Sequence, residues 1–341
     1  MTEFTPHPTE TIPDGETEAI RRVSEIQGAI TKAGLDPHKR GQHPKTTGLA
    51  QAYFDVAEDL PDDLKVGLFR IPGRYEALVR FSTGLEPKDN KPNSHAMAIK
   101  VLNADGRAQG NNLGVCQDFI SLAFPLFMIQ NVEQYVTMFE EALENPAAPK
   151  FWGAHPGLQQ LLAGHAKVVN CHLEQQYWGQ TPIAFGDGAA RFTIRPHIGN
   201  RSGLPLTDTA NGLRDALADQ LTSKRRTAKF DFCLQFQIDP ASMSVEDPSV
   251  PWGSAFFTVA TLTIPPQECT SDAHLSVGEN MTISPWHFLP EHRPLGGIQR
   301  CRKLVYEASV KLRHGENGIP GFELKREHLD ALGAISDRNA A

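Results

Sequence analysis

Hydrophobic residues follow a helical spacing near the start of the chain. Between residues 15 and 33 they recur at steps of three and four, from Ala19 to Ile30. This spacing places them on one face of a helix, and Gly34 is a typical residue to end it. Residues 1–15 are rich in Thr, Pro and Glu, a composition that favours a disordered or loosely held arm.

A series of short apolar runs with turn residues between them follows the first helix. The clearest runs from Phe230 to Ile238, where every second residue is apolar, so one face of a strand is expected to be buried. Strands at this spacing favour a large antiparallel sheet or barrel. The predicted strands cover residues 52–58, 65–71, 77–84, 95–102, 117–124, 190–196, 229–238 and 255–264.

Helical periodicity returns at intervals and dominates the end of the chain. No clean linker or internal repeat separates the strands. The length of 341 residues alone would allow two domains, but the pattern favours a single α+β domain with helices at both ends. The further predicted helices cover residues 129–145, 157–176, 208–221, roughly 295–314 and 323–334.

Composition narrows the class of protein. Lys plus Arg number 33 and Asp plus Glu 40, a net charge of −7, which argues against a nucleic-acid partner and against general attraction to an anionic membrane. Neither a secretory signal nor an apolar run of about 18 residues is present, so we expect no integral membrane segment. The five cysteines are scattered and odd in number, which fits neither a disulfide framework nor a zinc site and favours the cytoplasm.

Several standard catalytic signatures are missing from the sequence. It contains no G-x-x-x-x-G-K-[ST], G-x-G-x-x-G, H-E-x-x-H or G-x-S-x-G motif. Two histidine pairs, His38 with His43 and His287 with His292, each lie five residues apart in proline-containing loops. This spacing suits no single helix face and favours surface histidines.

The predicted helix near the C-terminus carries the most informative spacing. Arg302 and Tyr306 are four residues apart, and Arg313 follows seven residues later, so all three lie near one stripe of the helix. One interpretation is a solvated cationic face with one aromatic residue. The other is a phenol whose pKa a guanidinium lowers, and tyrosine is one of the known axial ligands of haem iron.

Several segments of the chain, taken in their order along the sequence, resemble the haem catalase superfamily, in particular its short catalase-related peroxidases. The resemblance covers about residues 36–314 and implies an antiparallel β-barrel of the haem catalase type with flanking helices. It divides the chain into an arm and helix (1–35), a haem-binding domain (36–314) and a helical tail (315–341). The strongest segments are residues 43–56, 77–83, 95–102, 117–131, 185–196 and 302–313.

The resemblance assigns roles on the distal side of the expected haem. The family pattern R-x-x-H-x-K is filled by Arg40, His43 and Lys45, which implies that His43 is the distal acid–base residue. The pattern V-R-F-S implies that Arg80 binds a haem propionate and that Ser82 lies near His43.

The family's proximal pattern R-x-x-x-Y-x-x-T-x-x-x-R is filled with Ser309 in place of the threonine. It implies that Tyr306 is the axial ligand of the haem iron, that Arg302 stabilises its phenolate and that Arg313 binds a propionate. A shifted register would bring His287 near the ligand position, but it leaves no arginine one helical turn earlier. The implied cofactor is haem b, since the chain has no C-x-x-C-H attachment motif.

The chain departs from the family pattern at several positions around the expected haem. Leu122 takes the place of the distal asparagine, which argues against efficient dismutation of hydrogen peroxide. Phe127 and Met128 replace a pair of phenylalanines, and Tyr135 replaces a haem-facing aromatic residue.

These features leave three functions open. The first is a haem peroxidase with weak catalase activity that cleaves peroxides and oxidises an organic donor. The second is an isomerase or lyase of organic or fatty-acid hydroperoxides, of the allene oxide synthase type. The third is a haem-binding protein without turnover. The expected partners are a peroxide, an organic electron donor and further copies of the chain in a homodimer or higher oligomer.

Overall fold

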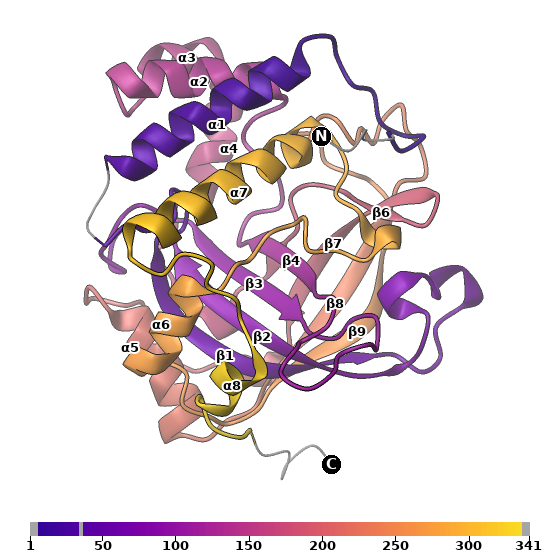
Figure 1. Ribbon diagram of the computed structural model, residues 1–341, viewed down its shortest axis with the longest axis vertical. Coiled ribbons are helices and arrows are strands. Elements are labelled where there is room, and N and C mark those ends of the chain that lie inside the picture. Colours follow the sequence, from indigo (N-terminus) through magenta and orange to yellow (C-terminus); the bar gives the residue numbers. More distant parts are fainter. Residues whose placement is uncertain (1–5, 34–36, 336–341) are drawn as a thin grey trace.

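The computed structural model describes residues 6–33 and 37–335, and at its centre antiparallel strands form a barrel (Figure 1). The strand order is β5-β4-β3-β2-β1-β9-β8-β7, and a second pairing of β7 with β5 closes the ring. A further short strand, β6, pairs with β7 beside β5. The strands are β1 (Lys45–Val56), β2 (Gly73–Thr83), β3 (His95–Val101), β4 (Gln117–Leu122), β5 (Tyr177–Trp178), β6 (Ile183–Phe185), β7 (Gly188–Pro196), β8 (Ala228–Phe236) and β9 (Phe256–Ile264).

Aromatic rings fill the interior of the barrel. The ring of Phe232 lies 4.6 Å from that of Phe119, 5.2 Å from Phe54 and 5.2 Å from Phe192, measured between centroids. Each such pair contributes about 0.5–1.5 kcal/mol beyond the burial of its apolar area. The alternation predicted from Phe230 to Ile238 is confirmed up to Leu234 in β8, whereas Ile238 lies beyond the strand and is exposed.

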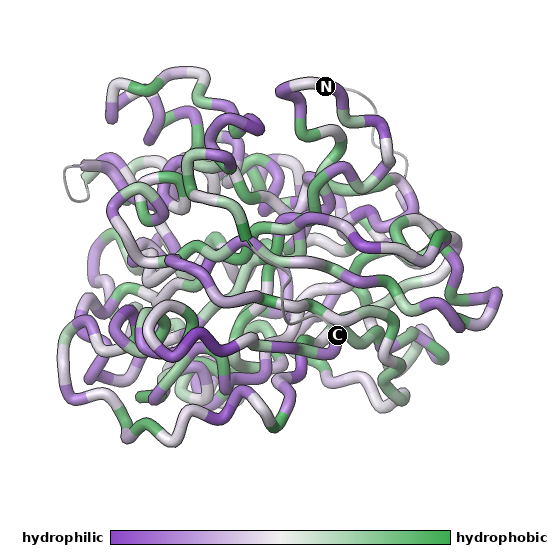
Figure 2. The backbone as a smooth tube through the Cα atoms, turned by 90° about the horizontal axis from the view of Figure 1, so that it is seen from below, coloured by the Kyte–Doolittle hydropathy of each residue, from purple (hydrophilic) through white to green (hydrophobic). Residues whose placement is uncertain are grey.

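The tube in Figure 2 changes between hydrophobic and hydrophilic segments over short distances, as expected for strands with one face in the core. No helix within residues 6–33 and 37–335 is both long and apolar enough to cross a bilayer.

Three long helices lie together on one side of the barrel (Figure 1). The helix α1 (Glu16–Lys32) packs against α2 (Val132–Glu144) and α7 (Gly297–Glu316) through a second apolar cluster that includes Val23 and Ile298. The other helices are α3 (Pro149–Ala154), α4 (Pro156–His165), α5 (Gly212–Leu217), which continues as a π-helix to Ser223, α6 (Asp272–Asn280) and α8 (Arg326–Asp330).

Some predicted elements are wrong. Residues 65–71 form no strand, because Gly67 has φ +54° and Leu68 N–H donates to His292 Nε2 in place of a neighbouring strand. The predicted helix 157–176 already ends at His165, and the helix 323–334 shrinks to α8. The sequence pattern also failed to indicate α3 and α6.

The prediction of a loosely held N-terminal arm is wrong for residues 6–15. The buried guanidinium of Arg300 binds Glu10 at 2.7 Å, Glu16 at 2.6 Å and Glu246 at 2.9 Å. A buried cation needs such partners, and the arm supplies one of the three carboxylates. Residues 1–5 of the predicted arm lie outside the described residues.

Candidate functional site

The helix α7 presents a phenol and a guanidinium one turn apart. Arg302 Nη2 donates to Tyr306 Oη at 2.9 Å, and Arg302 Nη1 donates to Thr181 Oγ1 at 3.3 Å and Gln299 Oε1 at 3.2 Å. Residues four apart on a helix lie above one another, so the spacing itself brings the pair together. A guanidinium that donates to the phenol oxygen favours the ionised phenol.

Three arginines from separate segments converge on the carboxylate of Glu279. It lies 3.4 Å from Arg40, 3.7 Å from Arg80 and 3.7 Å from Arg313. Arg80 and Arg313 are buried, at 4% and 1% relative exposure. The interpretation of the C-terminal helix as a solvated cationic face is therefore wrong for Arg313.

This arginine cluster (Arg40, Arg80 and Arg313) has an excess of positive charge. Arginine stays charged in proteins, so three guanidinium groups and one carboxylate leave a net charge of +2. Burial lowers the pKa of all three, that of Arg313 to about 10. Arg40 Nη1 and Arg313 Nε are buried and form no hydrogen bond. The cluster thus fits a ligand with two further negative charges and oxygen acceptors.

Strand β2 and the segment before β1 fix the position of Arg80. Its Nη2 donates to Thr46 Oγ1 at 2.7 Å and to the backbone oxygen of His43 at 3.0 Å. These bonds tie Arg80 to the predicted distal histidine. Arg40 is held separately, through a 2.7 Å bond from its Nη2 to the Met281 carbonyl.

His43 has a strained backbone and is half-buried. Its φ is +50°, in the left-handed region, and its Nδ1 is buried without a hydrogen bond. Burial, followed by the charge of Arg80, lowers its pKa to about 3, so the imidazole is neutral at pH 7. The charges of His95, His165 and Arg302 lower this pKa further.

Ser82 lies in β2 opposite Thr46 and is buried. No hydrogen bond joins its Oγ to His43 in the described part of the chain. Ser82 is thus near His43 only through the pairing of β2 with the start of β1, and its role beside the histidine stays a prediction.

Aromatic residues of α2 and the preceding loop border the same region. The rings of Phe127 and Tyr135 meet edge to face at 6.1 Å, and Met128 packs beside them in the α1–α2–α7 cluster. Burial raises the pKa of Tyr135, and nearby Cys301 raises it further. Tyr306 has the same effect on that pKa, so Tyr135 lies close to the predicted axial ligand.

Leu122 is the last residue of β4, where it pairs with Ala96 of β3 and Trp178 of β5. Its side chain is half-buried. An apolar group thus stands at the position where the family resemblance leads one to expect a hydrogen-bond donor.

The interpretation of the paired histidines as surface residues is wrong for His292. It is fully buried, and its ring packs against Phe69 at 5.3 Å. His287 lies apart from the phenol of α7 and bonds Asp118 at 2.8 Å.

Sequence reasoning missed Glu279, the carboxylate partner of the arginine cluster. It lies near the end of α6, which carries only a weak apolar pattern. No sequence motif identifies it. Only the tertiary contact between α6 and the chain near Thr46, whose Oγ1 donates to Glu279 at 3.0 Å, brings this carboxylate to the site.

Comparisons with known proteins agree with this geometry. No family model matches the chain. A protein of Mycolicibacterium paratuberculosis named catalase-related peroxidase is 28% identical over 322 residues, which cover 89% of this chain and 95% of that protein.

Solved catalases share the fold. A fungal catalase superposes with a TM-score of 0.65 at 13% identity, over 93% of this chain and 67% of the catalase. Catalase A from Saccharomyces cerevisiae gives 0.64 at 13% identity, over 94% and 72%. A bacterial catalase gives 0.62 at 12% identity, and this chain spans 63% of its length. The closed barrel and its flanking helices show that the chain has the catalase fold, and over most of its length its sequence is similar to that of a catalase-related peroxidase.

Proposed function

We propose that this protein is a haem-dependent peroxidase that cleaves hydroperoxides and oxidises an organic donor. The observation that carries the proposal is the arginine-bound tyrosine of α7, in a chain whose arginine cluster also holds the backbone of His43 through Arg80. Arg302 both donates to Tyr306 Oη and acts electrostatically on His43. A proton acceptor and a tyrosine ligand for haem iron are the parts that peroxide cleavage requires.

The donor set fits haem b. Arg40, Arg80 and Arg313 together with Glu279 carry the net +2 charge that two propionates would neutralise, and Arg40 Nη1 and Arg313 Nε lack a hydrogen-bond acceptor. Tyr306 would be the iron ligand, and Phe127 and Tyr135 would border the ring. When bound, haem supplies the redox chemistry that splits the O–O bond, which none of the side chains provides.

The side chains of the chain handle protons and charge around that step. His43, whose imidazole is neutral at pH 7, is the side chain that would take the proton of a hydroperoxide and return it to the departing oxygen. Arg302 donates a hydrogen bond to Tyr306 Oη at 2.9 Å and so would orient the phenol toward the iron. Catalytic roles are thus proposed for His43, Arg302 and Tyr306, with Ser82 positioning the distal side.

Leu122 favours organic hydroperoxides over hydrogen peroxide, because an apolar side chain accepts an alkyl group and offers no hydrogen bond to a small peroxide. We therefore expect weak dismutation of hydrogen peroxide. The same residue favours a second function, isomerisation or lysis of fatty-acid hydroperoxides, which consumes no electron donor.

One experiment separates these functions. The haem-loaded protein is mixed with hydrogen peroxide, cumene hydroperoxide or a fatty-acid hydroperoxide, with and without guaiacol as electron donor, and the products are identified. Turnover that requires guaiacol supports the peroxidase, whereas donor-independent rearrangement of the fatty-acid hydroperoxide supports the isomerase or lyase. A stable haem spectrum without reaction in any mixture would instead indicate a non-catalytic haem protein.

Three further proposals follow from the same basis. All five cysteines are free thiols, which suits the cytoplasm. Residues 36–314 are proposed as the haem-binding unit, flanked by the arm with its helix and by the helical tail. A homodimer or higher oligomer is proposed for the working protein, and light scattering of the purified chain would test it.

A further inference from the structure

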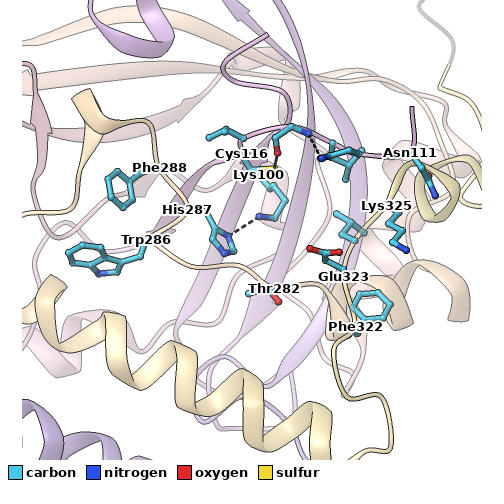
Figure 3. A pocket seen from close by; sticks show the side chains of 15 residues that line it. Lys100, Asn111, Cys116, Thr282, Trp286, His287, Phe288, Phe322, Glu323 and Lys325 are labelled. Atoms are coloured by element: carbon cyan, nitrogen blue, oxygen red, sulfur yellow. Dashed lines mark hydrogen bonds between the residues drawn. The ribbon is translucent and has the colours of Figure 1, made fainter. Parts of the chain in front are cut away.

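A cavity of about 690 Å³ lies between strand β3 and the C-terminal segment, apart from the arginine cluster in its lining residues. This volume is within the range of about 300–1,000 Å³ that small-molecule sites occupy. In Figure 3, Trp286 and Phe288 stand together at one end, Phe322 stands at the other, and His287 lies between them. The cavity thus has aromatic walls at both ends.

A buried carboxylate orients the histidine of this cavity. His287 Nδ1 lies 2.8 Å from Asp118 Oδ2 and 3.1 Å from Lys100 Nζ. The ammonium already donates to both oxygens of Asp118, at 2.8 and 2.9 Å. Because an ionised carboxylate can only accept, the shorter contact places the imidazole proton on Nδ1. The lone pair is then on Nε2, and the partly exposed ring offers it to the cavity.

The charges of the residues that line the cavity cancel in pairs. Lys100 is neutralised by Asp118, and Lys325 and Glu323 carry opposite charges. Outside the lining, the Nζ of Lys303 lies 5.4 Å from the centroid of the Trp286 ring. A site with aromatic walls, no net charge and one proton acceptor suits a neutral aromatic molecule with an acidic O–H.

A chain of hydrogen bonds leads from the aromatic wall to the proposed iron ligand. Trp286 Nε1 donates to the Gln299 carbonyl at 2.7 Å. Gln299 Oε1 accepts from Arg302 Nη1 at 3.2 Å, and Arg302 Nη2 donates to Tyr306 Oη at 2.9 Å. Gln299, through its backbone carbonyl and its side chain, and the side chain of Arg302 thus connect the indole of the cavity wall to the phenol of α7.

We propose that this cavity binds phenols as the electron donors of the reaction, an inference that rests on the proposed peroxidase function. Each phenol gives one electron toward Tyr306 by way of Trp286 and one proton to His287 Nε2, and becomes a phenoxyl radical. Two phenols reduce one hydroperoxide: ROOH with two electrons and two protons gives ROH and water. His287 is thereby a catalytic base for the donor, and Trp286 is both wall and relay.

Three variants of the full chain test the cavity with guaiacol as probe. Trp286→Leu removes the wall, and we expect guaiacol to bind about fivefold more weakly by calorimetry, with haem and without it. Trp286→Phe keeps the wall and removes the indole, so binding stays and kcat for guaiacol falls about tenfold. His287→Gln can still donate to Asp118 but accepts no proton, and kcat falls about a hundredfold with KM unchanged.

A matched control is Phe257→Leu, a half-exposed aromatic residue of β9 outside the cavity, which should behave as wild type. Wild-type affinity in Trp286→Leu, or wild-type kcat in both other variants, would overturn the donor site and leave the peroxidase standing. Weakened guaiacol binding in Trp286→Leu, combined with no peroxide cleavage by the wild type, would support the site and refute the proposed function.

Discussion

Replacing Glu279 with glutamine tests whether the arginine cluster is built for two further negative charges. The substitution keeps an acceptor for Thr46 and removes the carboxylate 3.4–3.7 Å from the three guanidinium groups. At an effective dielectric constant of about 20, each such pair represents roughly 4–5 kcal/mol of gross attraction. Desolvation offsets most of it, and we expect a net loss of about 3 kcal/mol in the free energy of unfolding of the haem-free protein.

The loss should be smaller in the haem-loaded protein. There the two propionates would bring the cluster from +3 to +1 in Glu279→Gln and from +2 to 0 in the wild type, so the arginines keep partners in both. We expect a cost of about 1 kcal/mol with haem bound, so haem stabilises the variant more than the wild type.

Urea unfolding with and without haem measures both differences. Glu307→Gln, on the exposed face of α7, serves as the control and should change stability by less than about 0.5 kcal/mol. The reasoning is refuted if haem-free Glu279→Gln is as stable as the wild type, or if its cost is the same in both states.

Three further predictions concern the same region and its pH response. Tyr306→Phe should abolish or greatly weaken haem retention, and an unchanged Soret band would rule out the tyrosine as ligand. Leu122→Asn should raise dismutation of hydrogen peroxide relative to cleavage of cumene hydroperoxide, measured as oxygen release against alcohol formation, and an unchanged ratio would contradict it. Burial lowers the pKa of His165 and of His292 to about 4 each, so the unfolded state takes up protons below its histidine pKa of about 6.5 while the folded state does not until about pH 4. The free energy of unfolding should therefore fall as the pH drops from 6.5 to 4, by about 1 kcal/mol per pH unit for each of the two histidines. Thermal melts of the haem-free protein measure this, and a melting temperature that stays constant over this pH range would refute the prediction.

The barrel was predictable where side-chain alternation reports burial directly. Phe230, Phe232 and Leu234 share a buried face, and the alternation of apolar residues along the sequence predicts this face without knowledge of the partner strands. Residues 65–71 have the same apolar composition but fold as turns, because the left-handed backbone of Gly67 and a buried histidine 225 residues away, His292, decide their conformation. Such a contact leaves no trace in local periodicity.

The candidate site was predictable to the extent that its residues share a helix turn or a family motif. The bond between Arg302 and Tyr306 follows from their spacing of four residues. Glu279 and the partners of Arg300 could not be predicted, since each depends on side chains brought together only by the complete fold. Acidic residues are common on surfaces, and nothing in a linear sequence separates a surface carboxylate from one that faces three buried arginines.

The bonds of Arg300 to Glu10 and Glu16 have a consequence for biosynthesis. They join the start of the chain to the first turn of α7, across more than 280 residues. A ribosome therefore releases more than 280 residues before the helix that carries Tyr306 can be anchored, and the barrel itself closes only after β9 has emerged to pair with β1. If haem binds at Tyr306 as proposed, its axial ligand becomes available only at this late stage of synthesis, and a nascent chain that stops short of α7 would lack that ligand.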